Sequence, residues 1–233
     1  MKNYTYKELS EMNFDDITES MLDDIRKSSC VKSARKVGKK QFNERTGRFF
    51  KKVIVTAFDE DEEDQDAFGD EFEYYVDLGK KLYVAYGSNL DMEQMRFRCP
   101  DAEVFGTGVL KNYSLTFWGN ARGNGVATVL PGADTDVPVA LWEISAADEK
   151  NLDRYEGYPW LYRKENIKVA MSDGTECVGM IYLMNNGIGT LPGDHYNNVI
   201  ARGYEDFGFD TAFLKASVDA LAAARYRFQK NFL

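Results

Sequence analysis

The stretch KLYVAYGSNL, residues 81–90, decides how the larger part of this chain is built. Its first residues alternate between two faces of an extended chain, which predicts a strand. Gly87 permits positive φ, and Asn89 tolerates it better than most residues. In such a turn, at the start of a helix, successive backbone N–H groups make a concave anion site. The alternative is a turn in which Ser88 or Asn89 only caps that helix.

The segment LDRYEGYPWLYR, residues 152–163, is the second informative motif. Gly157 is the usual residue after a helix C-terminus, so Glu156 falls on the last turn, where the helix dipole disfavours a carboxylate. Its aromatic neighbours in sequence are Tyr155, Tyr158, Trp160 and Tyr162. They predict a desolvated carboxyl group with a raised pKa, as a general base near neutrality requires. The alternative is a surface glutamate paired with Arg154 or Arg163.

Two other motifs carry less information. Residues 117–129, FWGNARGNGVATV, lack the GxxxxGK[ST] pattern of a phosphate loop and favour tight turns beside a core strand. His195 opens a helix after Pro192 and Gly193. It is either a catalytic group or a histidine at the surface or in a helix cap.

Composition excludes several classes of chemistry. The chain has one histidine, His195, and three widely separated cysteines, Cys30, Cys99 and Cys177. A zinc site requires several such ligands at metal spacing, so we predict no metal and no cofactor. No serine or cysteine lies in a nucleophile elbow. An enzyme of this composition works with carboxylates or with a nucleophile that the substrate carries.

The distribution of apolar residues along the chain predicts where in the cell the protein is found. No stretch approaches the roughly 18 apolar residues of a membrane helix, and the first residues, MKNYTYKELSEMNFDD, contain no apolar signal region. We therefore expect no membrane association and a cytoplasmic protein.

Charge is distributed in two opposite blocks within a net charge of −9. Residues Arg26 to Lys52 contain eleven bases and one acid, Glu44, whereas Asp59 to Asp77 contain eleven acids and no base. Such blocks neutralise each other in a folded module or dock a protein partner. The acidic block makes nucleic acid the less favoured partner of the basic one.

Periodicity divides the chain at about residue 80. We predict that residues 1–80 form a small α+β module of unknown role. Its apolar residues between Tyr6 and Ile25 have helical spacing, Arg48–Phe58 and Glu71–Leu78 read as strands, and Asp59–Asp66 is a solvated loop.

Residues 81–233 form the second predicted domain. Short strands interleaved with a few helices predict an α+β domain built on a small mixed β-barrel, rather than a doubly wound sheet. The expected strands are 113–118, 125–130, 137–144, 162–170 and 177–183. The expected helices are 91–98, 146–155 with Ser145 as N-cap, 195–207 and 211–231.

Taken together and in this order, the motifs resemble those of the γ-glutamylcyclotransferase and AIG2-like family. YGSNL is followed by the glycine-rich GVAT strand, then by the DxxEGYP segment with its later Tyr-Arg pair. A YxxxIxxG helix comes last, here Tyr196, Ile200 and Gly203. The resemblance covers residues 82–209 and implies a small β-barrel flanked by helices.

The resemblance also assigns residues to roles. It implies that Glu156 is the catalytic general base and acid. The substrate's glutamyl carboxylate would lie on the backbone of Gly87, Ser88, Asn89 and Leu90. Three side chains, Tyr86, Tyr162 and Tyr196, are expected to line the pocket. Apart from the resemblance, we expect the shape of the pocket around Trp118, Trp160 and Tyr196 to set the preference for the leaving amine.

The implied reaction releases 5-oxoproline and a free amine from a small γ-glutamyl amine, amino acid or peptide. The α-amine of the substrate attacks its own γ-carbonyl, so no cofactor is needed, and the activity is that of an acyltransferase or lyase. Two alternatives remain open. One is a catalytically weak AIG2-like binding protein, with residues 1–80 docking a protein partner. The other is removal of a γ-glutamyl tag from a larger amine or a protein lysine.

Overall fold

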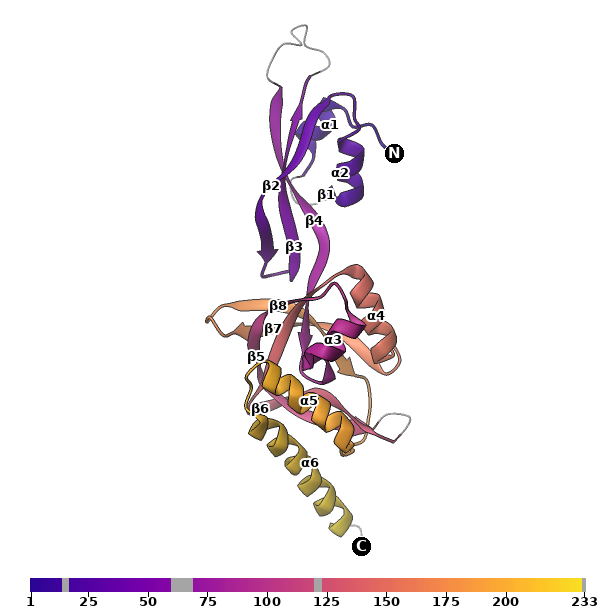
Figure 1. The fold of residues 1–233 in the computed structure, drawn as a ribbon, viewed down its shortest axis with the longest axis vertical. Helices are drawn as coiled ribbons and strands as arrows, with labels where there is room; N and C mark the ends of the chain where they lie inside the picture. Colours follow the sequence, from indigo (N-terminus) through magenta and orange to yellow (C-terminus); the bar gives the residue numbers. More distant parts are fainter. Residues whose placement is uncertain (14–16, 60–68, 120–122, 232–233) are drawn as a thin grey trace. The chain divides into compact units, whose positions relative to one another are not determined.

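The computed structural model describes residues 1–13, 17–59, 69–119 and 123–231 (Figure 1). It divides into two compact units, which we describe separately. The first comprises Met1–Glu44 and Arg48–Lys80, and the second comprises Arg45–Gly47 and Lys81–Leu233. One strand, β4 (Asp70–Ala85), contributes residues to both units.

The first unit contains two short helices and a small sheet. The elements are α1 (Tyr6–Glu11), β1 (Ile17–Thr18), α2 (Glu19–Ile25), β2 (Val31–Asn43) and β3 (Arg48–Ala57), followed by β4. The apolar residues over 6–25 have helical spacing, but the structure divides this stretch between two helices, α1 and α2. Met12 leaves helical geometry with ψ 135°, and Thr18 then caps a new helix by accepting a hydrogen bond from Met21 N–H.

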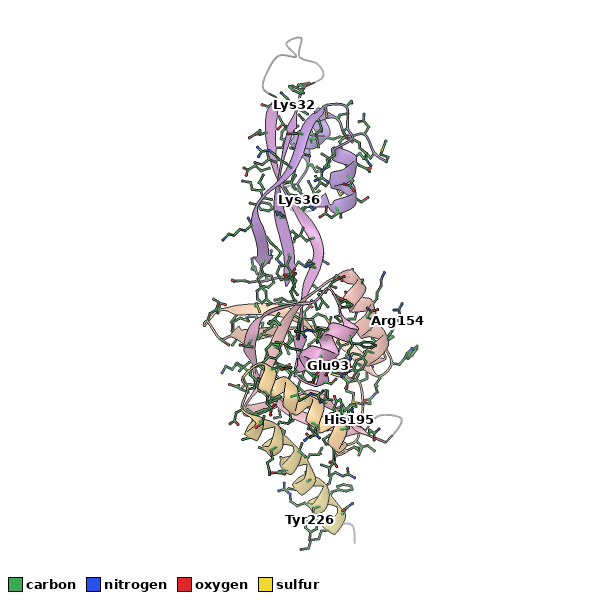
Figure 2. All side chains as sticks on the ribbon, in the orientation of Figure 1. Lys32, Lys36, Glu93, Arg154, His195 and Tyr226 are labelled. Atoms are coloured by element: carbon green, nitrogen blue, oxygen red, sulfur yellow. The ribbon has the colours of Figure 1, made fainter. Side chains whose placement is uncertain are left out.

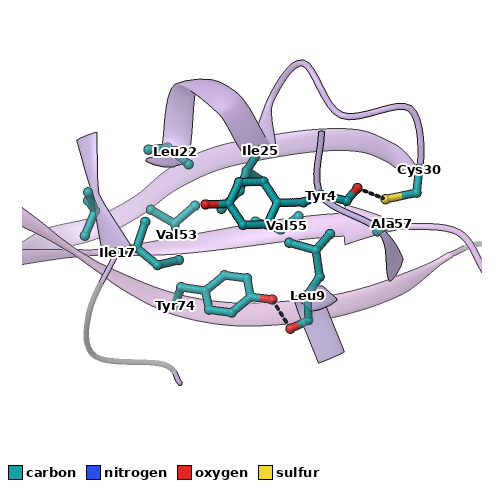
Figure 3. Close-up of a cluster of buried hydrophobic side chains, with 11 residues drawn as sticks. Tyr4, Leu9, Ile17, Leu22, Ile25, Cys30, Val53, Val55, Ala57 and Tyr74 are labelled. Carbon is teal, nitrogen blue, oxygen red and sulfur yellow. Dashed lines mark hydrogen bonds between the residues drawn. The ribbon is translucent and has the colours of Figure 1, made fainter. Parts of the chain in front are cut away.

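A hydrophobic core holds this unit together (Figure 3). Side chains from α1 and α2 pack against β3 and β4, and the hydroxyl of Tyr74 donates to the carbonyl of Leu9. The buried residues are Tyr4, Leu9, Ile17, Leu22, Ile25, Cys30, Val53, Val55, Ala57, Tyr74 and Val76. The helices therefore cover one face of the sheet, as an amphipathic pattern requires.

Strand β2 was not predicted, because most of its side chains are exposed and it carries many bases (Figure 2). Some cations of the basic block pair with acids of the same unit. The pairs are Arg35–Glu71, Lys52–Glu73, Arg48–Asp77 and Lys36–Glu19. Most of the predicted acidic loop lies outside the described residues. Docking of a protein partner by this unit stays a prediction.

The second unit is built on a ring of strands. Strand β4 pairs antiparallel with β6 and parallel with β8, β6 pairs with β5, β5 with β7, and β7 with β8. The new strands are β5 (Glu103–Gly119), β6 (Gly125–Ile144), β7 (Tyr162–Met171) and β8 (Glu176–Met184). The pairings close on themselves, which confirms the predicted α+β fold with a small, ring-like mixed sheet.

Three strand predictions in this unit were too short. The segments 125–130 and 137–144 belong to one continuous strand, β6, and β5 begins at Glu103 rather than near Tyr113. The β5–β6 ladder continues through a register shift between Lys111 and Tyr113, where Asn112 has φ 59°. The bulge at this register shift lets β5 and β6 stay paired on both sides of the segment that separates 125–130 from 137–144 in the sequence.

Helices pack around the ring at the ends of its strands. They are the 3₁₀ turn η1 (Ser88–Leu90), α3 (Met92–Arg98), α4 (Ala146–Glu156), α5 (Asp194–Asp206) and α6 (Thr211–Asn231). Helix α5 approaches η1 so closely that a Cβ on Gly203 would lie 2.5 Å from Leu90 Cβ. Among the helices that the structure describes, none is both long and apolar enough to span a bilayer.

Candidate active site

The YGSNL motif forms the turn between β4 and α3. The N–H of Leu90 donates to Gly87 O at 2.9 Å, and the N–H of Asp91 donates to Ser88 O at 3.3 Å. Within the described part of the chain, the N–H groups of Gly87, Ser88 and Asn89 make no hydrogen bond. The turn therefore presents three adjacent donors, whereas the donor of Leu90 is used inside the turn.

The expected positive φ in this turn is wrong. Gly87 has φ −121° and ψ −137°, and Asn89 is not among the residues with positive φ. Close approach favours glycine here instead, because a Cβ on Gly87 would lie 3.0 Å from Ala127 Cβ, a tight contact, and 3.6 Å from the Tyr196 hydroxyl. A side chain at this position would extend toward two residues that line the same cavity.

Helix α4 delivers Glu156 to the same region. Its start is a capping box in which Ser145 and Asp148 exchange hydrogen bonds with each other's backbone N–H. Its end is Gly157 in the left-handed conformation, with φ 66° and ψ 34°. The predictions of Ser145 as N-cap and Gly157 as C-terminal cap are confirmed, and Glu156 lies on the last turn.

A cavity of about 390 Å³ brings the two motifs together. Its walls contain most of the residues predicted from the sequence: Tyr86, Gly87, Ser88, Asn89, Glu156, Tyr162 and Tyr196. Leu90 is fully buried next to them but does not line the cavity. The remaining lining residues are Tyr83, Val126, Ala127, Tyr155, Leu161 and Tyr182. Six of the walls' side chains are therefore tyrosines.

Glu156 and the turn are in direct contact. Asn89 Nδ2 donates to Glu156 Oε1 at 2.9 Å and to the Tyr83 hydroxyl at 2.6 Å. Burial raises the pKa of Glu156 to about 7, although the charge of Arg98 and the hydrogen bond from Asn89 act in the opposite direction. A carboxyl group with this pKa exchanges a proton readily near neutral pH.

Comparison with known families settles what kind of domain surrounds this cavity. Residues 83–204 match the family described as "Gamma-glutamyl cyclotransferase, AIG2-like". The chain belongs to this family. It is 32% identical over 135 residues to the human protein named gamma-glutamylcyclotransferase, an alignment that covers 54% of this chain and 71% of the human one. The bovine protein of the same name is 29% identical over 142 residues, covering 58% of this chain and 75% of the relative.

Solved structures agree with this assignment. One described as "Gamma-glutamyl cyclotransferase" has a TM-score of 0.55 and 28% identity, over 59% of this chain and 85% of its own. The crystal structure of YkqA from Bacillus subtilis has a TM-score of 0.53 and 17% identity, over 86% of this chain and 92% of its own. At that identity the likeness shows the fold alone. The aligned part, 86% of this chain, is longer than residues 81–233.

The tyrosines of this γ-glutamylcyclotransferase-family cavity are fixed by hydrogen bonds to backbone. Tyr86 donates to Tyr182 O at 2.6 Å, and Tyr162 donates to Ala127 O at 2.8 Å. The N–H of Ala127 donates to the Tyr196 hydroxyl at 3.2 Å. Burial raises the pKa of Tyr86, Tyr162 and Tyr196, so these rings stay neutral near pH 7 and shape the cavity as rigid walls.

Some residues near the motifs point elsewhere. Trp160 is 89% exposed and does not line the cavity, and Trp118 lines a separate pocket of about 230 Å³. The expected place of these two tryptophans around the cavity is therefore wrong, because adjacency in sequence to a motif does not fix the direction of a side chain. His195 is exposed and also lies outside the lining residues (Figure 2).

The alternative prediction for Glu156, a surface glutamate paired with Arg154 or Arg163, is not supported by the contacts of these two arginines. Arg154 bonds to Asn151, and Arg163 pairs with Glu165 rather than with Glu156. Within the described ranges, no group of three His, Cys, Asp or Glu side chains is placed to hold a metal ion.

Several residues of the site were missed by sequence reasoning. Tyr83 lies in the quoted strand, where alternation alone gave no reason to separate it from a core residue. Tyr182 on β8 donates to Asp153 of α4 at 2.6 Å, a contact between positions 29 residues apart. Arg98 on α3 contacts both the turn and Tyr155. No local pattern marks these positions, because each acts through a long-range contact.

Proposed function

We propose that this protein is a γ-glutamylcyclotransferase that releases 5-oxoproline and a free amine from small γ-glutamyl compounds. The observation that carries the proposal is the contact of Glu156 with Asn89, beside three free N–H groups in one tyrosine-lined cavity. This arrangement suits a substrate that carries a carboxylate, an amine and an amide within a few bonds of one another.

The chemistry is an intramolecular acyl transfer. The substrate's α-amine attacks its γ-carbonyl carbon, a C–N bond closes a five-membered lactam, and the original amide C–N bond breaks. Because the amine and the carbonyl belong to one molecule, the attack has the advantage of an intramolecular reaction, worth up to roughly 7–11 kcal/mol over a bimolecular one, and the protein adds to it by holding the curled conformation. The nucleophile and the leaving group both belong to the substrate, so the protein supplies positioning and proton transfer.

Glu156 moves the proton in both directions. Its carboxylate takes one proton from the substrate's ammonium group, which frees the amine to attack, and gives that proton to the departing nitrogen. The second proton that the attacking nitrogen loses as the lactam forms also goes to the released amine, which leaves as an ammonium ion. The pKa of about 7 matches this double role, because both protonation states are populated near neutrality. The base must be ionised in the free enzyme, so kcat/KM is expected to rise with pH through about 7.

The turn binds the negative charges of the substrate. Gly87, Ser88 and Asn89 line the cavity, and their N–H groups, which make no other hydrogen bond in the described part of the chain, are available to the glutamyl carboxylate or to the oxyanion of the tetrahedral intermediate. Donors held in a rigid turn need no rearrangement during the reaction, which is what makes such stabilisation effective.

The direct test is turnover of a panel of γ-glutamyl amines, amino acids and peptides, with 5-oxoproline measured by chromatography. Glu156→Gln keeps the size of the side chain and removes the base, so kcat is expected to fall by about 10²–10⁴-fold. Glu93→Gln, an exposed glutamate on α3, is the matched control and should remain fully active. A folded Glu156→Gln protein with wild-type turnover would refute the role of this carboxyl group.

A further inference from the structure

Arg98 lies behind the cavity, at the last turn of α3, and is half-buried. Its guanidinium group donates from Nη1 to Asn89 Oδ1 and to Ser88 Oγ, the latter at 3.2 Å, and from Nη2 to Gln94 Oε1 at 2.6 Å. Arg98 does not line the cavity. It reaches the site through two residues of the turn.

The contact with Asn89 has a consequence for Glu156. A carboxamide has one accepting end and one donating end, whereas a guanidinium group only donates. Arg98 therefore fixes the oxygen of Asn89 toward itself. The Nδ2 end must then face the opposite way, where it donates to Glu156 and to Tyr83. An ionised Glu156 only accepts and favours the same orientation, but a protonated Glu156 can also donate, so the guanidinium group is what keeps the amide in one orientation in both protonation states of Glu156.

Arg98 also ties the turn to helix α4. Its guanidinium carbon lies 3.6 Å from the centroid of the Tyr155 ring, and its carbonyl oxygen accepts from Asn151 Nδ2 at 3.1 Å. Tyr155 in turn shares a hydrogen bond of 3.1 Å with Ser88. The planar, charged group thus contacts both structures that meet at the cavity, the turn and the helix that carries Glu156.

We propose that Arg98 is a positioning residue for the reaction, which locks the Asn89 amide with its N–H end toward Glu156 and holds the turn against α4. The rate part of this proposal rests on the proposed function. The effect of Arg98 on the protonation of Glu156 does not, because it is a property of the protein without substrate.

The groups around Glu156 make Arg98 the main opposing charge. The titratable side chains that face it from the neighbouring elements are Tyr83, Tyr86, Cys99, Tyr155, Tyr162, Tyr182 and Tyr196. Burial raises the pKa of six of them, so these six groups are neutral near pH 7: Tyr83, Tyr86, Cys99, Tyr162, Tyr182 and Tyr196. Arg98 lowers the pKa of Glu156 against the effect of burial, and so does the hydrogen bond from Asn89. Losing both effects raises that pKa.

The first experiment compares Arg98→Gln with Arg98→Lys, and with Arg96→Gln as the control. Arg96 is an exposed base on the same helix, so its replacement changes the net charge equally. Arg98→Gln is expected to lower kcat about 10–100-fold, more than it raises KM, and to move the rising limb of the pH profile to higher pH. Arg98→Lys should return the rising limb of the pH profile to its wild-type position but recover only part of kcat. The lysine ammonium group keeps the positive charge but lacks the planar set of donors of a guanidinium group.

A titration separates this inference from the proposed function. Carboxyl carbons of ¹³C-labelled glutamates are followed by NMR, and the Glu156 signal is assigned by its loss in Glu156→Gln. A higher pKa in Arg98→Gln, with Arg96→Gln unchanged, supports the inference even if no γ-glutamyl compound is turned over. An unchanged pKa in Arg98→Gln overturns it, whatever the activity.

A double-mutant cycle tests whether Arg98 acts through Asn89. In the Asn89→Ala background, Arg98→Gln should lower kcat far less than in the wild-type background, because the amide that it orients is gone. Losses that multiply independently would overturn the positioning role. Arg98→Lys provides the same comparison if Arg98→Gln fails to fold.

Discussion

The two units of this molecule differ in what they bury. Among the described residues, the first unit buries one polar side chain, Ser28, within an otherwise apolar core. The second unit buries Ser88, Asn89, Asp91, Thr128, Glu143 and Asp148. Removing polar groups from water costs free energy unless each finds a partner. The second unit therefore maintains an arrangement that stability alone does not favour.

The partners show why this arrangement persists. Asp91 caps α3 and receives Arg202 of α5, while Asp148 caps α4. Asn89 joins the turn to Glu156. Each of these buried groups fixes an element that positions the cavity. By contrast, Ser28 joins Tyr4, near the start of the chain, to α2: its hydroxyl accepts from Tyr4 N–H at 2.8 Å and donates to Asp24 O at 3.0 Å. The comparison teaches that burial serves stability in the first unit and geometry in the second.

The largest expected effect comes from a matched pair of substitutions, each of which creates a cavity in the core of one unit. Leu22 on α2 and Leu152 on α4 are both fully buried, so Leu→Ala at either position should destabilise its unit by about 2–5 kcal/mol. Leu152→Ala should also lower kcat/KM at least about 10-fold, because α4 carries Glu156 and small displacements of a catalytic group are costly. Leu22→Ala should leave turnover unchanged.

Hydrogen exchange measured peptide by peptide assigns each loss of stability to its unit, and 5-oxoproline release at a temperature where both variants are folded gives the rates. Equal losses of kcat/KM in the two variants would contradict the separation of roles. Such a result would mean that the core of the first unit also determines the geometry of the site.

The second prediction concerns the cost of burying Glu156. Its pKa is about 7 in the folded protein against an ordinary value of 4.5, so the folded state binds the proton more tightly than the unfolded state. Stability is then highest when both states are protonated, and it falls as pH rises from about 4.5 to 7. Glu156→Gln removes this dependence, so it should exceed the wild type by about 1–3 kcal/mol above pH 7.

Urea unfolding at pH 4.5 and pH 8 measures this difference. The stability gap between Glu156→Gln and the wild type should be small at the lower pH and large at the higher one. Glu93→Gln, at an exposed position, should show no such growth. A gap that is the same at both values would mean that Glu156 titrates as an ordinary surface carboxyl group.

The site was predictable to the extent that it is encoded in short motifs. YGSNL and DRYEGYP each predict a local structure, and the structure places both on one cavity. What the motifs leave out is the contact that joins them. Arg98 and Tyr182 contribute through partners that are distant in sequence, and one chain contains no signal for such pairs. Trp118 and Trp160 were misplaced for the complementary reason, because proximity in sequence was taken for proximity in space.

The fold was predictable where apolar side chains repeat with a clear period. The hairpin of β7 and β8 and the helices α3 to α6 follow such patterns closely. Strand β2 does not, because it lies at the end of the strand order and most of its side chains face solvent. The pattern over residues 6–25 was also misleading. The described apolar positions Leu9, Ile17, Leu22 and Ile25 all lie in the core, but they come from α1, β1 and α2 rather than from one helix.

The smallest expected effect compares ion pairs from the two units. Arg202 donates to Asp91, whose side chain is 2% exposed, from both Nε at 2.9 Å and Nη2 at 2.8 Å. Arg202→Met leaves a buried carboxylate oxygen without these donors and should cost about 1–2 kcal/mol. Lys52 pairs with Glu73, which is 56% exposed, so Lys52→Met should change stability by less than about 0.5 kcal/mol.

Thermal unfolding at low and high salt distinguishes the two pairs. The Lys52 pair is solvated, so whatever it contributes should vanish as salt screens it, whereas the cost of Arg202→Met should persist. Arg202→Met should also raise KM, because Asp91 follows the turn whose N–H groups are proposed to hold the substrate carboxylate. If both substitutions proved equally mild and salt-sensitive, the buried charges of the second unit would have no special part in shaping its cavity.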